Sequence, residues 1–547
     1  MPKGYLAFIF HAHLPYVRHP EHKRSLEEKW FFEAITECYI PLLRVFQQLE
    51  SDGIDYAVTF SLSPTLLSML EDPFLQGRYG DYLAMLQSLA TREEERTAGD
   101  PDFAPLAQMY RQRLDHTAWL YNEKYGRRLV KAFQELQQTG RMELITSAAT
   151  HGFLPLLGIS KEALYAQLTA GMDYFESIFG YRPRGIWLPE CGYDPFMEEI
   201  LSELGLHYFV LATHGVLYAS PRPKYGVYSP ILTTGGLAAF GRDPETSTQV
   251  WSAKEGYPGD FNYREFYRDI GFDLDMESVG DFLHPKGLRS NTGFKYYRIT
   301  GPGEHKEPYN PQWAAERARE HAENFMFNRE KQVEYYGNLM DRPPLINAPY
   351  DAELFGHWWF EGPLWIDKLC RLLAEHPRRP VEMVTPGQYL EKGYPLQEST
   401  PNASSWGDKG YFEVWLNGEN DWTYRHLHRA ASRMVSLATD FPGAKGMLQE
   451  ALTQAARELL LAQSSDWPFI MTAGTMDIYA RQRIKSHLLR FFALEQQIRE
   501  NRIDPGWLNA LQSTDNLFPH LDYRLFQSHE VTTPVESQAL QSAKTQM

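Results

Sequence analysis

The chain has 547 residues, with 54 lysines and arginines against 70 aspartates and glutamates, and a formal net charge of −16. This acidic balance argues against a nucleic-acid partner, because it provides no positive field to displace counterions from phosphates. Hydrophobic residues make up 43% of the chain, enough for a large core, which excludes global disorder. At about 150 residues per domain, the length indicates three or four structural units.

The sequence contains no apolar run near the roughly 18 residues that a membrane-spanning helix needs. The apolar stretch 5–10 runs directly into His11 and lacks the cleavage site of a secretory signal. Three widely spaced cysteines, Cys38, Cys191 and Cys370, provide neither a disulfide framework nor a thiolate zinc site. We therefore expect a soluble cytoplasmic protein with no membrane partner.

Short β-rich runs alternate with longer helical patterns along the first 384 residues. The predicted strands are 5–10, 56–60, 142–146, 185–188, 208–211, 237–240, 345–348 and 382–384. The helical patterns between them are 30–49, about 65–138, 161–179, 195–204, 311–335 and 364–373; Asp194 and Pro195 mark the start of one as N-cap and first helical residue. This alternation is typical of βα units with a parallel sheet, most simply closed into a barrel over residues 1–398.

Several segments depart from the plain repeat. The helical stretch at about 72–128 is too long for one crossover and is predicted to be an inserted subdomain, and 256–312 is a long Gly-, Pro- and Tyr-rich excursion near the barrel mouth. From 399 to 529 the strand pattern disappears, and helices at 426–437, 444–462 and 476–501 predict a C-terminal helical domain. The polar end, 530–547, is predicted to be a disordered tail.

Polar residues follow the predicted strands at the ends where a parallel barrel carries its working groups. His11 and His13 follow the first strand and are two residues apart, so both are expected to face the mouth. His151 follows the third strand, Glu190 the fourth and Asp351 the seventh.

The two carboxylates each have a purely structural explanation. Asp351 is a candidate N-cap for a helix starting near Ala352, and Glu190 is a candidate ion-pair partner of Arg182 or Arg184. Aromatic residues are 14% of the chain and surround both carboxylates, and such surroundings make an unused charge costly. As a pair they are the groups of glycoside chemistry, one attacking the anomeric carbon and the other protonating the departing oxygen.

The residues by themselves are also compatible with two other functions. His11, His13 and His151 with a carboxylate are also a candidate metal site of a hydrolase or carbohydrate deacetylase. A glucan-binding protein without turnover is the third hypothesis, because rings on loops hold sugars by stacking.

Five motifs resemble glycoside hydrolase family 57. They are His11-Ala12-His13-Leu14-Pro15-Tyr16, His151-Gly152-Phe153, Trp187-Leu188-Pro189-Glu190-Cys191-Gly192-Tyr193, the segment from Tyr350 to Gly362, and Trp415-Leu416-Asn417-Gly418-Glu419-Asn420. The resemblance covers about residues 1–520. The helical C-terminal block and the segment from Trp251 to Asp260 look most like the 1,4-α-glucan branching members, whose relatives include α-amylases, 4-α-glucanotransferases and amylopullulanases.

The resemblance implies an α/β fold, an incomplete (β/α)7 barrel with an inserted helical subdomain and a C-terminal helical domain. It implies a retaining mechanism without metal or other cofactor, with Glu190 as nucleophile, Asp351 as general acid/base and the carboxyl groups about 5–5.5 Å apart. It also implies substrate-binding roles, with His11, His13 and His151 in the donor pocket and further contacts from Arg264, Gly280, Trp406, Asp466 and Thr475. Candidate walls for the acceptor are Trp251, Trp406, Trp415 and Trp422, each with domain packing as its alternative, and Trp358 is expected beside the acid.

The implied reaction moves a cleaved α-1,4 glucan onto the 6-hydroxyl of a second glucan, so donor and acceptor chains are the expected partners. Branching relatives carry a mobile loop with a tyrosine between the nucleophile strand and the Trp251 segment. Here 217–243 holds Tyr218, Tyr225 and Tyr228, and none of them is assigned. A mainly hydrolytic α-amylase or a 4-α-glucanotransferase is therefore the nearest alternative.

Overall fold

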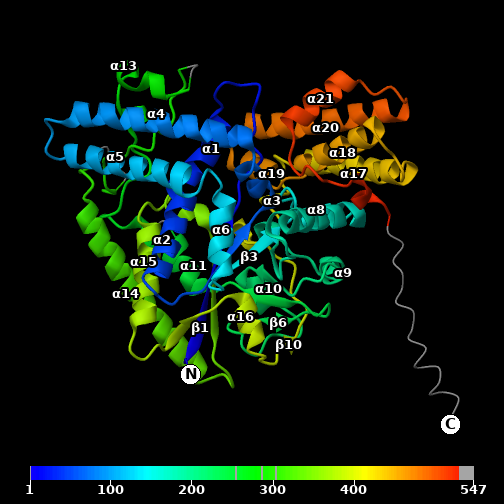
Figure 1. Ribbon diagram of the computed structural model, residues 1–547. Coiled ribbons are helices and arrows are strands. Elements are labelled where there is room, and N and C mark those ends of the chain that lie inside the picture. Colours follow the sequence, from blue (N-terminus) through cyan, green and yellow to red (C-terminus); the bar gives the residue numbers. More distant parts are fainter. Residues whose placement is uncertain (1, 253–254, 285–286, 302, 304, 529–547) are drawn as a thin grey trace, which may run out of the picture.

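The computed structural model describes residues 2–252, 255–284, 287–301, 303 and 305–528 (Figure 1). The predicted tail 530–547 lies outside the described residues. Within them, no helix combines the length and apolar character needed to cross a membrane.

A curled, mostly parallel sheet forms the centre of the molecule. Seven parallel strands follow the order β7-β5-β4-β3-β2-β1-β8. Their bounds are β1 Gly4–Ala12, β2 Val58–Leu62, β3 Met142–Ser147, β4 Gly185–Trp187, β5 Tyr208–Leu211, β7 Ala238–Gly241 and β8 Leu345–Asp351. β1 is buried along its whole length, as expected of a strand in a parallel sheet covered on both faces.

The sheet is an incomplete barrel. Its end strands β7 and β8 meet through single hydrogen bonds, from the Asp243 amide to the Asn347 carbonyl (2.8 Å) and from Asn347 Nδ2 to the Gly241 carbonyl (3.3 Å). The predicted strand at 382–384 is β9, Val381–Met383, which pairs with β1. Two short strands were not predicted, β6 (Ile231–Leu232) and β10 (Gln397–Glu398), because two residues carry no alternation to detect.

Helices surround this curled sheet. In the barrel region they are α1 Leu26–Ala34, α2 Ile40–Ser51, α3 Pro64–Leu70, α4 Pro73–Thr97, α5 Ala104–Trp119, α6 Leu129–Gln138, α7 Leu154–Leu157, α8 Lys161–Phe179, α9 Glu198–Glu203, α10 Thr213–Leu217, α11 Pro244–Trp251, α12 Ile270–Asp273, α13 Met276–Val279, α14 Pro311–Gly337, α15 Gly362–Glu375 and α16 Pro386–Glu391. The predicted helix 30–49 is in fact α1 and α2, joined through a π-helical turn, Ile35–Tyr39. The predicted helix at 195–204 starts as a 3-10 turn capped by the Asp194 side chain.

The inserted helices and the C-terminal helices lie over the carboxyl ends of the strands, at the top of Figure 1. The C-terminal helices are α17 Trp422–Asp440, α18 Met447–Ala462, α19 Asp466–Ala473, α20 Asp477–Arg499 and α21 Pro505–Thr514. Direct hydrogen bonds join them to the barrel loops, including one from the Ser465 amide to the His151 carbonyl (3.0 Å). This placement brings C-terminal side chains to the end of the barrel where catalytic groups are expected.

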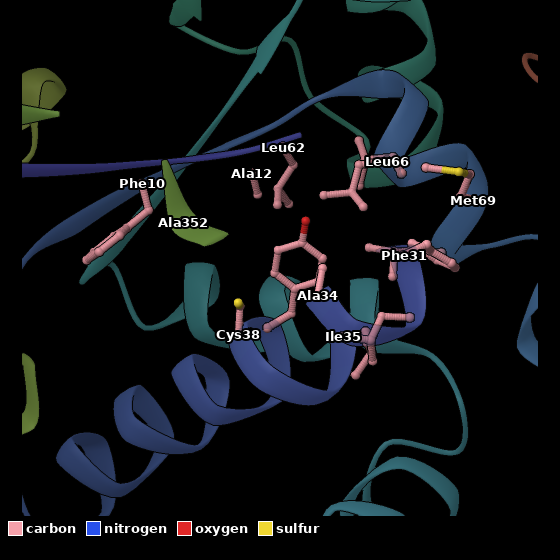
Figure 2. Close-up of a cluster of buried hydrophobic side chains, with 14 of the residues drawn as sticks. Phe10, Ala12, Phe31, Ala34, Ile35, Cys38, Leu62, Leu66, Met69 and Ala352 are labelled. Carbon is pink, nitrogen blue, oxygen red and sulfur yellow. The ribbon is translucent and has the colours of Figure 1, made fainter. Parts of the chain in front are cut away.

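Apolar side chains fill the space between the sheet and its helices. Figure 2 shows part of this core, in which β1, β2, α3 and the α1–π-helix segment converge. Its labelled side chains include Phe10, Ala12, Phe31, Leu62, Leu66 and Met69. The core therefore fixes the ends of β1 and β2 relative to each other.

Candidate active site

Glu190 lies just past β4 in a strained backbone conformation. It occupies the middle of the 3-10 turn Pro189–Cys191 with φ 61° and ψ 23°. A left-handed conformation costs a non-glycine residue about 1–3 kcal/mol, and such strain collects at functional sites. The Glu190 carbonyl accepts a hydrogen bond from the Trp406 amide (3.0 Å), which holds the turn in place.

The Glu190 carboxylate accepts two further hydrogen bonds. Trp406 Nε1 donates to Oε2 (2.9 Å), and the Ser465 hydroxyl donates to Oε1 (3.2 Å). These two donors come from residues more than 200 positions away in the chain, and together they fix both oxygens.

The structural explanation of Glu190 as an ion-pair partner is wrong. Arg182 pairs with Asp173 and Glu176, and Arg184 pairs with Glu143 and Glu391.

Asp351 ends strand β8. It precedes the 3-10 turn Ala352–Leu354, but its side chain caps no backbone amide there, so the capping explanation is also wrong. Asp351 pairs with His11 in the register of β1 and β8, which places the acid beside the histidine motif.

Burial raises the pKa values of both carboxyl groups. Loss of water raises the pKa of Glu190 to about 7, although the bonds from Trp406 and Ser465 oppose the rise by stabilising the anion. Burial also lifts the pKa of Asp351 well above its ordinary range, with further contributions from the charges of Glu353 and Glu190. Burial and these charges therefore favour the protonated form of Asp351, whereas Glu190, with a pKa of about 7, is partly ionised near neutral pH. Glycoside chemistry needs this division of roles.

Three histidines stack beside these carboxylates. The His11 ring lies 4.5 Å from the Trp187 ring, and the His13 and His151 rings are 3.8 Å apart. Burial lowers the pKa values of His11 and His151 well below the usual range, so these rings are neutral. Neutral imidazoles can donate to or accept from sugar hydroxyls.

The histidines differ in the hydrogen-bond partners of their Nε2 atoms. His11 Nε2 meets His151 Nε2 (2.9 Å), whereas His13 Nε2 lies 3.1 Å from the Asp466 carboxylate at the start of α19. The other ring nitrogens lie within hydrogen-bond distance of the hydroxyls of Ser61, Ser63 and Ser465. Among the described residues, the one group of metal-ligand type with all its atoms close together is Glu458, His487 and Asp515, in the C-terminal helices.

Sequence reasoning missed several residues of this site. Glu353 accepts hydrogen bonds from the His13 amide (3.3 Å) and from the Tyr39 hydroxyl. Arg242 directly follows β7 and lies over the Trp406 ring, 5.6 Å from its centre. The position of Arg242 after a strand was a usable signal, and Ser465 directly precedes Asp466, which the family resemblance had already assigned to substrate binding.

An aromatic cavity of about 730 Å³ is lined by Trp251 and by Leu354, which follows Asp351 by three residues. It brings together three predicted residues, Trp251, Arg264 and Trp358. The Trp251 ring lies 6.3 Å from the ring of Trp406, which bonds Glu190. The described residues that line the cavity are Trp251, Pro258, Gly259, Arg264, Glu265, Phe266, Tyr267, Arg268, Ile299, Gly301, Gly303, Lys306, Leu354 and Trp358.

The structure places other predicted residues apart from this group. Gly280 starts a 3-10 turn against α4, and Thr475 is exposed in the link between α19 and α20. Trp415 is 1% exposed and stacks on Phe153 with ring centres 4.4 Å apart, so it packs the C-terminal segment against the barrel. Trp422 begins α17 and donates its ring N–H to the Glu419 carbonyl (3.2 Å).

Two of the three candidate loop tyrosines lie at the far end of the barrel. The Tyr228 carbonyl accepts from the amide of Leu345, the first residue of β8. Tyr225 lies against Arg342, just before the same strand. Tyr218 is exposed directly after α10.

Comparison with known proteins gives consistent matches. The model of glycosyl hydrolase family 57 matches residues 7–401, and the model of the C-terminal region of 1,4-alpha-glucan branching enzymes matches 426–526. A 1,4-alpha-glucan branching enzyme of Thermococcus kodakarensis is 36% identical over 94% of this chain and 77% of its own length.

Solved structures agree over nearly the whole chain. An α-amylase from Thermotoga maritima has a TM-score of 0.90 and 42% identity, covering 97% of this chain and all of its own. A branching enzyme of the family from Pyrococcus horikoshii has a TM-score of 0.87 and 34% identity, covering 96% of this chain and 97% of its own. The incomplete barrel with its C-terminal helical region is the architecture shared with these proteins. The chain therefore belongs to glycosyl hydrolase family 57.

Proposed function

We propose that this protein is a retaining 1,4-α-glucan branching enzyme that cleaves α-1,4 links and re-attaches the chain through α-1,6 links. The observation that carries the proposal is the pair of buried carboxyl groups at the barrel mouth, with a fixed Glu190 anion and a protonated Asp351. The C-terminal match at 426–526 favours branching over the other activities of the family.

The reaction has two displacements. Asp351 donates its proton to the glycosidic oxygen while the Glu190 carboxylate attacks the anomeric carbon. The reducing-end segment leaves with that oxygen and proton, and the other segment stays bound to Glu190 as a glycosyl ester. Asp351, now ionised, takes the proton of an acceptor 6-hydroxyl, whose oxygen displaces Glu190 from the sugar. Two inversions retain the α configuration.

The substrate groups follow from the same arrangement. His11, His13 and His151 line the donor pocket with Asp466, while Trp251, Arg264, Trp358 and Trp406 contact glucan around it. Trp415 acts indirectly, through the packing of its segment against Phe153, and Gly280 and Thr475 lie outside this group.

The proposal also covers the domain organisation, the natural substrate and the cellular compartment. Residues 1–398 form the catalytic domain with the insertion at 72–128, and 399–529 form the helical domain. The natural substrates are storage glucans of the glycogen type in the cytoplasm. Three buried, unpaired cysteines support a reducing compartment.

Linkage analysis of treated amylose tests the proposal. We expect loss of iodine staining together with new α-1,6 signals in the proton NMR spectrum, and neither from Glu190→Gln or Asp351→Asn. Reducing ends without α-1,6 linkages would overturn it.

Hydrolysis is the second candidate function. The Thermotoga maritima structure with 42% identity is titled an α-amylase, and Tyr225 and Tyr228 lie away from the mouth. The same amylose experiment separates the two, because a hydrolase releases one reducing end per cleavage without forming branches.

A further inference from the structure

The aromatic cavity adjoins the segment that follows Asp351 and the ring that lies beside Trp406. Leu354, which lines it, follows Asp351 by three residues, and Trp251 forms the wall toward Trp406 and Glu190. In a double displacement, the group that protonates the departing oxygen also deprotonates the incoming hydroxyl. Departing chain and acceptor therefore both pass the Asp351 side.

The cavity presents three large rings to solvent. Tyr267 is 78% exposed, Trp358 54% and Trp251 46%. Single exposed rings are common on proteins, but here they gather in one hollow of about 730 Å³, within the usual size of ligand sites. Flat rings with polar rims are suited to the apolar faces of pyranose rings.

Phe266 contacts two of these three rings, those of Trp358 and Tyr267. Its ring stacks on Trp358 with centres 4.4 Å apart at 26°, and meets Tyr267 edge-on at 5.2 Å and 90°. A wall whose rings are fixed before binding loses little conformational entropy when a chain settles on it.

Buried charges brace the wall from behind. The Lys295 ammonium lies 4.6 Å from the centre of the Phe266 ring and 3.6 Å from the Asp269 carboxylate. His357, the residue before Trp358, pairs with Glu37 (2.6 Å) and packs its ring edge-on against Phe266. These ion pairs hold the groups that pack against Phe266, and Phe266 in turn contacts Trp358 and Tyr267.

We propose that this cavity seats the acceptor glucan, and that Tyr267 and Trp358 decide how well an acceptor chain competes with water for the glycosyl-enzyme. The inference rests on the proposed two-displacement function and adds the acceptor-binding residues to it. The occupant is an uncharged α-1,4 glucan, because the most exposed side chains that line the cavity are the rings of Tyr267, Trp358 and Trp251.

Partitioning of a glycosyl fluoride tests the inference. α-Maltotriosyl fluoride forms the glycosyl-enzyme without a departing sugar chain, so fluoride release reports donor chemistry alone. With maltohexaose as acceptor, we expect Tyr267→Ala and Trp358→Ala to need about three- to tenfold more acceptor for half-maximal transfer, the worth of one aromatic contact. Fluoride release without acceptor is the reference for each variant.

Phe261→Ala is the matched control, because Phe261 is an equally exposed ring (62%) on the same segment that does not line the cavity. Its partitioning should equal that of the unaltered protein. Equal partitioning in Tyr267→Ala and Phe261→Ala would overturn the inference while leaving the proposed function intact. A parallel loss of fluoride release and transfer would also overturn it, since the cavity would then serve the donor. Failure of the unaltered protein to transfer at all would instead overturn the proposed function.

Discussion

Two buried groups of carboxylates and histidines in this molecule have opposite surroundings. At the barrel mouth, Glu190 and Asp351 lie beside neutral histidines, and within the described chain neither forms an ion pair with lysine or arginine. In the C-terminal helices, Glu458 bonds His487 (2.7 Å) and Asp515 bonds Arg490 (2.5 Å), with all three of Glu458, His487 and Asp515 fully buried.

The difference shows what makes a buried carboxylate reactive. Burial raises the pKa of the carboxyl groups in both places, but in the C-terminal helices arginine cations neutralise the charge and packed side chains enclose it. At the mouth neither carboxylate forms an ion pair with lysine or arginine within the described chain, and the nearby Arg242 charge lowers the pKa of Asp351 without outweighing burial. We infer that the group in the C-terminal helices stabilises the packing of those helices, whereas the group at the barrel mouth carries out the chemistry.

Removal of the proposed catalytic carboxylates should have the largest effect on activity. Glu190→Gln is expected to lower the rate of α-glucan cleavage by at least about 10⁴-fold, because no nucleophile remains. The pKa of Glu190 in the folded protein, about 7, is above the unfolded value, so its contribution to stability is present at low pH and lost as pH rises through 7. The variant should therefore melt at the same or a higher temperature than the unaltered protein above pH 7, measured by calorimetry. A lower melting temperature would mean that Glu190 has a structural role.

Disrupting the group Glu458, His487 and Asp515 should lower stability and leave activity unchanged, the reverse of the result for Glu190. Arg490→Met leaves Asp515 buried without its cation, which is expected to cost about 3 kcal/mol in the free energy of unfolding. The rate per folded molecule should stay near that of the unaltered protein. Arg524→Met is the control, because the pair of Arg524 with Asp522 is exposed and contributes less than about 1 kcal/mol. Equal denaturation midpoints for the two variants would contradict the comparison.

A change at Glu353 should move one limb of the pH profile. The cleavage rate should rise with pH as Glu190 ionises and fall as Asp351 loses its proton. The Glu353 charge helps to raise the pKa of Asp351, so Glu353→Gln is expected to move the alkaline limb to lower pH by about one unit. The acid limb should stay closer to its original position, and an alkaline limb that does not move would rule out this role.

Loss of a donor to Glu190 should have the smallest effect. Trp406→Phe keeps a ring but removes the N–H bonded to Glu190 Oε2, so the anion is less stable and the acid limb should move up by up to about one pH unit. Ser465→Ala removes a longer bond and should move it by a few tenths. A shift toward lower pH in either variant would contradict the assignment of these bonds.

The sequence was informative for features that depend on short stretches of the chain. Each of the seven parallel strands was predicted near its observed position, since buried apolar runs between helical patterns are a local signal. His11 and Asp351 were identified as strand-end residues, and the strand register brings them together. The alternation of strand and helix patterns does not indicate how strongly the sheet curves. The incomplete barrel was predicted from the resemblance to the family.

Partners from distant segments were beyond local reasoning. Ser465 reaches Glu190 only because the C-terminal helices fold over the barrel mouth. Arg242 and Glu353 follow the ends of β7 and β8, but only the tertiary structure shows that they lie beside Trp406 and His13. The same folding places Trp415 in a packed interface rather than on the substrate side, although its motif looks like that of the other candidate tryptophans.

The amino-acid sequence by itself determined the family, the order of the elements and the two carboxylates, because these depend on short motifs and on apolar periodicity. Only the tertiary structure decided which groups touch those carboxylates and which of the rings face a cavity. Hydrogen bonds and burial depend on segments hundreds of residues apart, and their pairing is fixed only when the whole core packs.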